Sequence, residues 1–188
     1  MQKLEKINVN QHEEEPEQNI ILFKGSVLDV KVDAIVNSAN RSLLAGDGVD
    51  GAIHKAAGKE LLEECKTLNG CKPGHCKITN AYNITWAKYI IHAVGPRWVD
   101  KDAAALLWNC YYEALQLAAR YNCHSVAFPC ISTGIYGMPL DLAANQALGA
   151  INKWLGENEN TDLTIYICCY REAEYKIYNK ILNKKTEE

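Results

Sequence analysis

The chain has 188 residues, the length of one ordinary domain or two very small ones, and 48% of them are hydrophobic. That content suffices for one continuous core, so we expect a single domain. The formal net charge is −3 and the basic residues are dispersed, which disfavours binding a nucleic-acid backbone by charge. No apolar run approaches the roughly 20 residues of a membrane span, and residues 1–18 lack the apolar segment of a secretion signal. We therefore expect a cytoplasmic protein.

Residues 1–18 contain an acidic run around Pro16, which predicts a flexible leader before the first strand. Short aliphatic runs then predict strands at residues 20–23 and 34–37. From Val49 to Cys65, apolar residues recur every four positions, as expected for one amphipathic helix.

The second half of the chain continues the alternation. Strands are predicted at residues 89–94, 125–130 and 163–169. Apolar series predict the helices around and after them, at residues 107–115 and 142–154 and around Ile177 and Ile181. The predicted domain covers residues 19–184 and leaves a tail at 185–188.

Strands that alternate with helices indicate an α/β fold, a three-layer α/β/α sandwich around a mostly parallel sheet. In such sheets, ligands bind beyond the carboxyl ends of the strands. Function is therefore expected in the loops after Val36, Val94, Cys130 and Cys169.

The eight cysteines stand in apolar surroundings or at irregular spacings, in a chain without an export signal. We expect reduced and mostly buried thiols. Cys71 and Cys76, with His75 between them, could be part of a metal site, but no second ligand pair stands at zinc spacing. The sequence therefore predicts neither a metal nor another cofactor.

The first informative loop follows the strand at 34–37. Gly46 and Gly48 precede a helix, so backbone amides and the positive end of the helix dipole could face an anion there. A simple tight turn is the alternative. Asp50 either begins the helix as an ordinary charge or holds a reacting group, and His54 lies one turn later on the same face. Asn40 could orient a hydroxyl or bond nearby backbone.

The second informative loop is ISTGIYGMP at residues 131–139. Its small and hydroxylated residues again allow amides to approach a phosphate, while Tyr136 offers an aromatic face to a sugar. Two such loops after two strands predict a site for two phosphates. A pair of unrelated turns is the alternative.

Three segments resemble a known family in sequence, order and predicted context. They are VDAIVNSANRSLLAGDGVDGAIHKAAG at 32–58, YIIHAVGP at 89–96 and the ISTGIYGMP loop. These segments are similar to those of MacroD-type macrodomains, and the resemblance extends from about Ile20 to Leu182. Such proteins bind ADP-ribose, remove it from acidic side chains, and deacetylate O-acetyl-ADP-ribose.

The resemblance implies a role for each matching position. Asn40 would contact the distal ribose, Asp50 would orient or activate a water, and His54 would support the loop. Tyr170 would lie against the adenine. The remaining implied ligand contacts are made by Ala39 and the first loop, by the second loop, and by the turn after the first strand: Gly46, Asp47, Gly48, Val49, Ser132, Thr133, Gly134, Ile135, Tyr136, Ser26 and Val27.

Two departures from the family pattern affect these expectations. Gly25-Ser26-Val27 replaces the family's Gly-Asp-Ile, so a neutral hydroxyl stands where a carboxylate would accept from adenine. Adenine selectivity is therefore expected to be weaker; Asp29 is not assigned this role. Ala45 and Asp47 replace glycines in the first loop, and we expect the Asp47 carboxylate to face solvent.

Three functions remain open on the sequence. The presence of both Asn40 and Asp50 favours a hydrolase acting on ADP-ribosylated proteins or O-acetyl-ADP-ribose. A module that reads ADP-ribose without hydrolysing it would use the same loops. A protein recognising RNA or poly-ADP-ribose is the third hypothesis, although the chain shows no basic groove. No helical face demands a partner, so a monomer is expected.

Overall fold

The computed structural model describes residues 19–184, so the leader and tail expected from the sequence lie outside the described residues. Six strands are described: β1 (Ile20–Lys24), β2 (Ala34–Ala39), β3 (Cys76–Asn80), β4 (Tyr89–Val94), β5 (Ser125–Pro129) and β6 (Thr164–Cys169). The helices are a 3-10 turn, η1 (Val27–Asp29), and α1 (Gly48–Ala57), α2 (Lys59–Thr67), α3 (Ala103–Arg120), α4 (Leu140–Glu157) and α5 (Glu172–Lys184).

The strands form one sheet in the order β1-β6-β5-β2-β4-β3. All neighbours pair in parallel except β3, which runs antiparallel to β4. The five strands predicted from aliphatic runs are all present, because strands covered on both faces need few polar positions. The predicted α/β/α fold with a mostly parallel sheet is confirmed.

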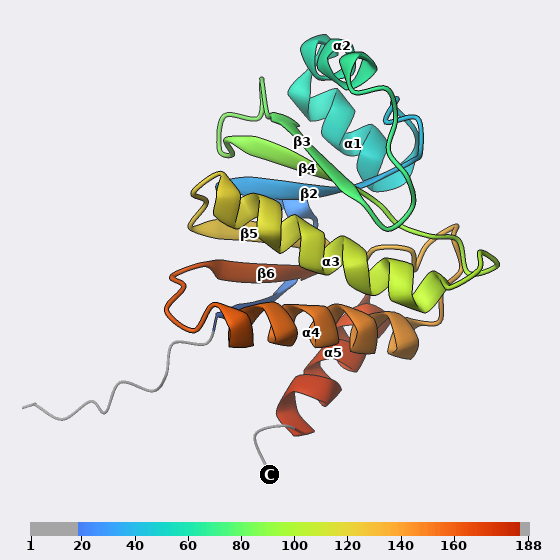
Figure 1. The fold of residues 1–188 in the computed structure, drawn as a ribbon, viewed down its shortest axis with the longest axis vertical. Helices are drawn as coiled ribbons and strands as arrows, with labels where there is room; N and C mark the ends of the chain where they lie inside the picture. Colours follow the sequence, from blue (N-terminus) through green and yellow to red (C-terminus); the bar gives the residue numbers. More distant parts are fainter. Residues whose placement is uncertain (1–18, 185–188) are drawn as a thin grey trace, which may run out of the picture.

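Helices cover both faces of the sheet. Val36 of β2 packs in one hydrophobic core with Tyr111 of α3 and Trp154 of α4. Its neighbour Ile35 packs in the other core with Ile53 of α1. In Figure 1, α3 and α4 lie across the front of the sheet, with α1 and α2 at the other face. The two alternating faces of each strand therefore build two separate cores.

The single helix predicted between Val49 and Cys65 is wrong. The segment forms two helices, α1 and α2, separated at Gly58 with φ 90° and ψ 178°. A four-residue repeat drifts by roughly 40° per step around a 3.6-residue helix, so one straight helix cannot keep the whole series on one face. The break at Gly58 redirects the chain, and Leu61 joins Ile53 in the same core.

The sequence did not predict β3. Its residues Lys77 and Asn80 are polar, and the strand pairs only with β4 at the edge of the sheet. An edge strand buries little surface and carries a weak hydrophobic pattern. It nevertheless covers one side of β4.

Six of the eight cysteines are buried, as expected, while Cys71 and Cys130 are half-buried. Cys76 Sγ donates to the Cys110 carbonyl oxygen, and His75 Nδ1 lies 3.0 Å from Glu113 Oε2. Across residues 19–184, no three potential ligands gather into a metal site. In the same part of the chain, no helix combines the length and apolar character needed to cross a bilayer.

The backbone at Gly58 generates the first prediction. Its φ and ψ lie in a region open essentially to glycine, and an added Cβ would lie 2.7 Å from Asn83 Nδ2. We expect Gly58→Ala to lower the free energy of unfolding by about 1–3 kcal/mol in urea denaturation.

The matched control is Gly156→Ala in α4, where no atom lies within 4 Å of an added Cβ. Alanine in this ordinary helical position should raise the free energy of unfolding by about 0.5–1 kcal/mol. Equal effects of the two substitutions would show that the break between α1 and α2 does not need glycine.

Candidate functional site

The site lies at the edge of the sheet where the parallel strands end. β2 and β5 are neighbours there, but β2 leads into α1 on one face and β5 leads towards α4 on the other. Diverging connections of this kind leave a crevice between the two loops. The two loops predicted to carry function, after β2 and after β5, therefore lie side by side.

The strand order also sets the sequence of these loops along the edge. Ser26 and Tyr170 follow the neighbouring strands β1 and β6, the ISTGIYGMP loop follows β5, the loop of Asn40 follows β2, and Gly95 follows β4. At the usual spacing of about 4.8 Å between strands, this row is roughly 19 Å long. An elongated ligand could contact every loop.

Asp50 connects the first loop to the sheet. Its side chain is buried in the first turn of α1, where Oδ1 accepts from Asn37 Nδ2 at 2.6 Å and Oδ2 accepts from the Gly46 amide at 2.6 Å. Asp47, not Asp50, is the N-cap, and its side chain is exposed as expected. Because Gly46 N–H already donates to Asp50, this amide is not directed at an anion as the sequence suggested.

A buried relay of polar groups holds Asn37. Its Nδ2 also lies 3.1 Å from Nδ1 of His92, and His92 Nε2 lies 2.9 Å from Thr79 Oγ1 on β3. An amide nitrogen can only donate, so Nδ1 of His92 accepts and Nε2 carries the proton. Burial, with a smaller contribution from His54, lowers the pKa of His92 to about 3. The ring therefore stays neutral and keeps its direction.

His54 lies beside Asp50, as the one-turn spacing predicted. Its Nε2 is 3.4 Å from Asp50 Oδ1, and its side chain is 6% exposed. This contact lacks hydrogen-bond geometry, and no other described residue bonds either ring nitrogen. Buried nitrogens of this kind need a partner that the described residues do not supply.

Asn40 braces the loop through its own amide. Nδ2 donates to the Leu44 carbonyl oxygen at 2.9 Å, and Oδ1 accepts from Ser42 Oγ at 2.7 Å. An added Cβ on Gly46 would lie 3.2 Å from Asn40 Nδ2 and 3.1 Å from Asp50 Oδ2. Two of the three predicted catalytic residues, Asn40 and Asp50, therefore converge on Gly46, although local bonds fix the Asn40 amide; the third is His54.

The second loop is held by its hydroxyl side chains. Ser132 Oγ donates to the Pro96 carbonyl oxygen at 2.7 Å, and Thr133 Oγ1 donates to the Cys130 carbonyl oxygen at 2.9 Å. Ser132 has φ 67°, a conformation that costs energy for a residue other than glycine. These hydroxyls shape the loop rather than point at a ligand. The amides of Ile131, Gly137 and Met138 are already bonded, so the potential anion donors are the backbone amides from 132 to 136.

The tip of the second loop is open. Ile135 is 96% exposed, and an added Cβ on Gly134 would meet no atom within 4 Å. Tyr136 is half-buried, and its carbonyl oxygen accepts from Trp98 N–H at 2.8 Å. The loop thus has a fixed base and an accessible tip.

Arg171, just before α5, and Glu174, in the first turn of α5, brace this loop, and sequence reasoning missed both. Arg171 Nη2 donates to the Thr133 carbonyl oxygen at 2.9 Å, and Glu174 Oε2 lies 3.1 Å from Thr133 Oγ1. Arg171 Nε also lies 3.3 Å from Glu174 Oε1. They belong to no motif, and a spacing of three residues at a helix start gives no sign of a distant loop.

The far end of the row is formed by the turn after β1 and the end of β6. The Ser26 hydroxyl accepts from Leu28 N–H at 3.2 Å, and Ser26 N–H donates to Asp29 Oδ2 at 2.9 Å, which makes a capping box. The Val27 side chain is buried, so only its backbone could reach a ligand. Tyr170 is 81% exposed and leaves its ring open to a flat partner.

One cavity brings Asn40 and Tyr136 together. It has a volume of about 430 Å³ and is also lined by Arg41, Ser42, Gly95, Arg97 and Asp100. The other predicted residues, Ala39, Gly46, Gly48 and Val49 among them, do not line it. No pattern along the chain singles out Arg41, Arg97 or Asp100, because their proximity depends on β2 and β4 being neighbours.

Comparison with known proteins decides the family. The family model described as Macro domain matches residues 36–147. A macro domain-containing protein of Methanosarcina mazei is 50% identical over 167 residues, which cover 88% of each chain. The chain belongs to the Macro domain family.

Two further relatives refine this placement of the macrodomain. The mouse protein named ADP-ribose glycohydrolase MACROD2 is 49% identical over 170 residues, which cover 89% of this chain and 36% of the relative. The chain thus spans about a third of that relative's length. The solved structure of a Trypanosoma brucei macrodomain in complex with ADP-ribose superposes with a TM-score of 0.82 at 42% identity, covering 89% of this chain and 72% of that chain. These likenesses confirm the resemblance to MacroD-type macrodomains.

The buried His92 of this macrodomain generates the second prediction. Its pKa of about 3 lies below the ordinary value of 6.5, so the unfolded chain binds one more proton as the pH falls from 6.5 towards 3. Stability should therefore decrease on acidification. Between pH 6.5 and 5.0, the wild type should lose roughly 1.5 kcal/mol more than His92→Gln in urea denaturation.

The matched control is His124→Gln, because the His124 side chain is 68% exposed. This variant should retain the pH dependence of the wild type. The same loss of stability in wild type and His92→Gln would contradict a neutral, buried His92.

Proposed function

We propose that this macrodomain binds ADP-ribose and hydrolyses its ester links to acidic protein side chains, or the ester of O-acetyl-ADP-ribose. The observation that carries the proposal is the buried Asp50 carboxylate, oriented by Asn37 and Gly46 and converging with Asn40 on one point. The name of the MACROD2 relative, an ADP-ribose glycohydrolase, supports the same activity.

The geometry allows backbone amides to bind the phosphates of ADP-ribose without positively charged side chains. α1 begins at Gly48 beside the first loop, and the first amides of a helix have no partner within it. The braced second loop adds backbone amides from the other side of the crevice. In this proposal, the adenine lies against the exposed ring of Tyr170 and the distal ribose lies by Asn40.

Asp50 and His54 would then act on a water next to the distal ribose. Each Asp50 oxygen accepts one hydrogen bond from the protein and keeps a second lone pair for a water. His54 offers a buried nitrogen 3.4 Å from the same carboxylate. Water cleaves the ester bond, ADP-ribose is released with its hydroxyl, the acidic side chain or acetate leaves as a carboxylate, and the remaining proton of the water passes by way of Asp50 to solvent.

The third prediction separates a hydrolase from a reader. Asp50→Ala and Asn40→Ala should each lower turnover of an ADP-ribosylated glutamate substrate at least tenfold, equivalent to about 1.4 kcal/mol of lost transition-state stabilisation. ADP-ribose release gives the turnover, and calorimetric titration with ADP-ribose gives the affinity of the same samples.

The control for Asn40 is Ser42→Ala, which removes the hydroxyl that donates to Asn40 Oδ1 but leaves the amide. We expect this change to lower turnover by less than about threefold, since it removes only two neutral hydrogen bonds of an exposed hydroxyl, one to Asn40 Oδ1 and one from the Leu44 amide. Wild-type protein that binds ADP-ribose but releases none from the substrate would make the chain a reader.

A further inference from the structure

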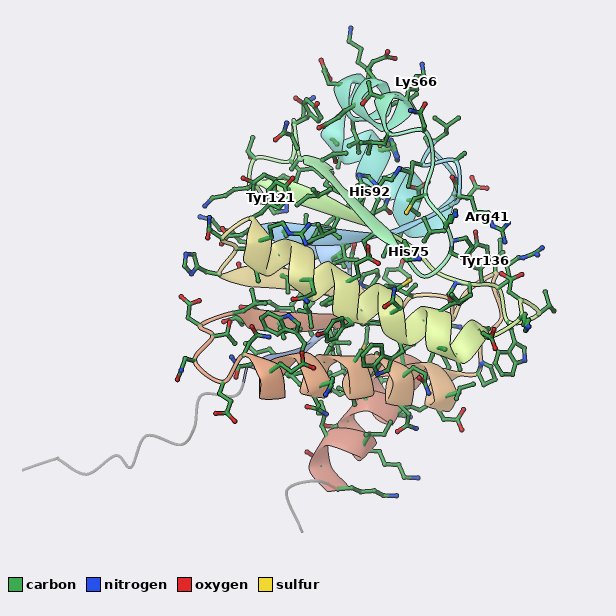
Figure 2. All side chains as sticks on the ribbon, in the orientation of Figure 1. Arg41, Lys66, His75, His92, Tyr121 and Tyr136 are labelled. Atoms are coloured by element: carbon green, nitrogen blue, oxygen red, sulfur yellow. The ribbon has the colours of Figure 1, made fainter. Side chains whose placement is uncertain are left out.

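A groove runs from the proposed site along the outside of the first loop. The cavity that contains Asn40 adjoins a second one of about 600 Å³, and the two share Arg41 and Ser42. The second cavity is also lined by Leu44, Lys66, Asn69 and Gly70. Figure 2 shows Arg41 and Tyr136 on the side where the strands end, with Lys66 on α2 above them. We call the two joined cavities the loop groove.

Arg97 and Asp100 at the base of the groove neutralise one another. Arg97 donates from Nη2 and Nε to Asp100 Oδ1 at 2.8 and 3.1 Å, and from its backbone N–H to Oδ2 at 2.9 Å. These bonds hold the pKa of Asp100 below its ordinary value. The carboxylate is thus already used by Arg97.

Arg41 keeps most of its charge exposed. Its Nη2 lies 3.9 Å from Asp100 Oδ2, too far for a hydrogen bond, and its side chain is 64% exposed. Since Asp100 is bonded to Arg97, it neutralises Arg41 only weakly. The planar guanidinium of Arg41 can therefore accept a carboxylate in the two-pronged geometry that arginine favours.

One lysine, Lys66, extends the positive charge along the groove, and a second, Lys77, lies behind it. Lys66 Nζ lies 3.1 Å from Glu63 Oε1, but both side chains are more than half exposed, and such pairs contribute little. Glu63 does not line the groove. Behind its wall, Lys77 Nζ donates to the carbonyl oxygens of Leu68 and Gly70 at 2.6 and 2.5 Å.

The groove is therefore cationic in a chain whose formal net charge is −3. Its described lining residues carry three positive side chains, Arg41, Lys66 and Arg97, and one negative side chain, Asp100. A local surplus of this kind attracts an anionic partner over the rest of an acidic surface.

We propose that the loop groove binds acidic residues next to the ADP-ribosylated side chain of a protein substrate. The inference rests on the proposed function, in which the ester lies by Asn40, where the groove begins. The polypeptide leaves the ester through the groove, and flanking carboxylates meet Arg41 and then Lys66. Leu44, 40% exposed, contacts the aliphatic part of the segment.

An acidic peptide fits the groove better than a nucleic acid does. Single-stranded nucleic acids require rows of aromatic side chains as well as cations. Among the described lining residues, Tyr136 alone is aromatic, and it lies at the ester end of the groove. Isolated cations separated by polar residues suit isolated carboxylates on an extended chain.

The test uses two peptides that carry ADP-ribose on one glutamate. One has aspartates on both sides of this glutamate, and the other has serines there. Wild-type protein should give a kcat/KM at least about fivefold higher on the acidic peptide, and the preference should shrink as NaCl rises from 50 to 500 mM. Arg41→Glu should lower kcat/KM on the acidic peptide at least tenfold, through KM.

Lys66→Glu, which lines only the second cavity and lies farther from the ester, should lower kcat/KM on the acidic peptide by a smaller factor. This variant should leave kcat/KM on O-acetyl-ADP-ribose unchanged, since that substrate has no polypeptide, and it tests the groove if Arg41→Glu folds poorly. The matched control is Arg120→Glu, at the far end of α3 from the groove. This helix begins just after Asp100 and is roughly 26 Å long, so Arg120 lies far from the groove. This control should behave as wild type on every substrate.

Equal kcat/KM on the two peptides, or equal losses on the peptide and on O-acetyl-ADP-ribose in Lys66→Glu, would overturn the groove and leave the hydrolase intact. If wild-type protein hydrolyses no substrate, the hydrolase proposal fails, and the affinities of fluorescent forms of both peptides, measured by anisotropy, still decide the groove. Displacement of the acidic peptide by an oligothymidylate at lower concentration than by poly-glutamate would assign the groove to nucleic acid instead.

Discussion

The site depends on one buried carboxylate, whose oxygens must accept hydrogen bonds. Asp50 accepts from Asn37 on β2 and from the amide of Gly46 in the loop, so a single side chain joins sheet, loop and α1. A buried charge without such donors would cost several kcal/mol, and this cost forces the loop to turn inward at Gly46. The turn in turn brings Asn40 next to Asp50. Loop shape and proposed chemistry therefore rest on the same two hydrogen bonds.

The donors to Asp50 have their own supports. Asn37 can direct its amide at the carboxylate because a neutral His92 accepts its other proton, and His92 in turn donates to Thr79. Thr79 comes from β3, the antiparallel strand at the edge. This strand adds little to the core, but it covers His92 and completes the relay. The edge strand thus fixes the orientation of the Asn37 amide, which lies two strands further into the sheet.

The sequence predicted the architecture well because strands covered on both faces consist of short aliphatic runs. It failed where local pattern and tertiary packing differ. The break at Gly58 was hidden by a continuous apolar spacing, and β3 was hidden by its polar residues. The motifs correctly placed Asp50 next to His54, but not the directions of hydroxyls and amides. Ser132 points to Pro96, a partner 36 positions away, and no local pattern contains that information.

The net charge of the chain does not reveal the local positive charge of the loop groove. Arg41, Lys66 and Arg97 are scattered along the sequence, and only the neighbouring positions of β2, β4 and α2 bring them to one groove. The proposed phosphate loops, by contrast, rely on backbone amides and a helix start. On the proposed function, the diphosphate and the polypeptide are thus recognised by different chemistry. Because backbone amides bind the nucleotide, the positively charged side chains remain available to discriminate among protein substrates. Changes in the groove can therefore alter the choice of protein without altering the affinity for ADP-ribose.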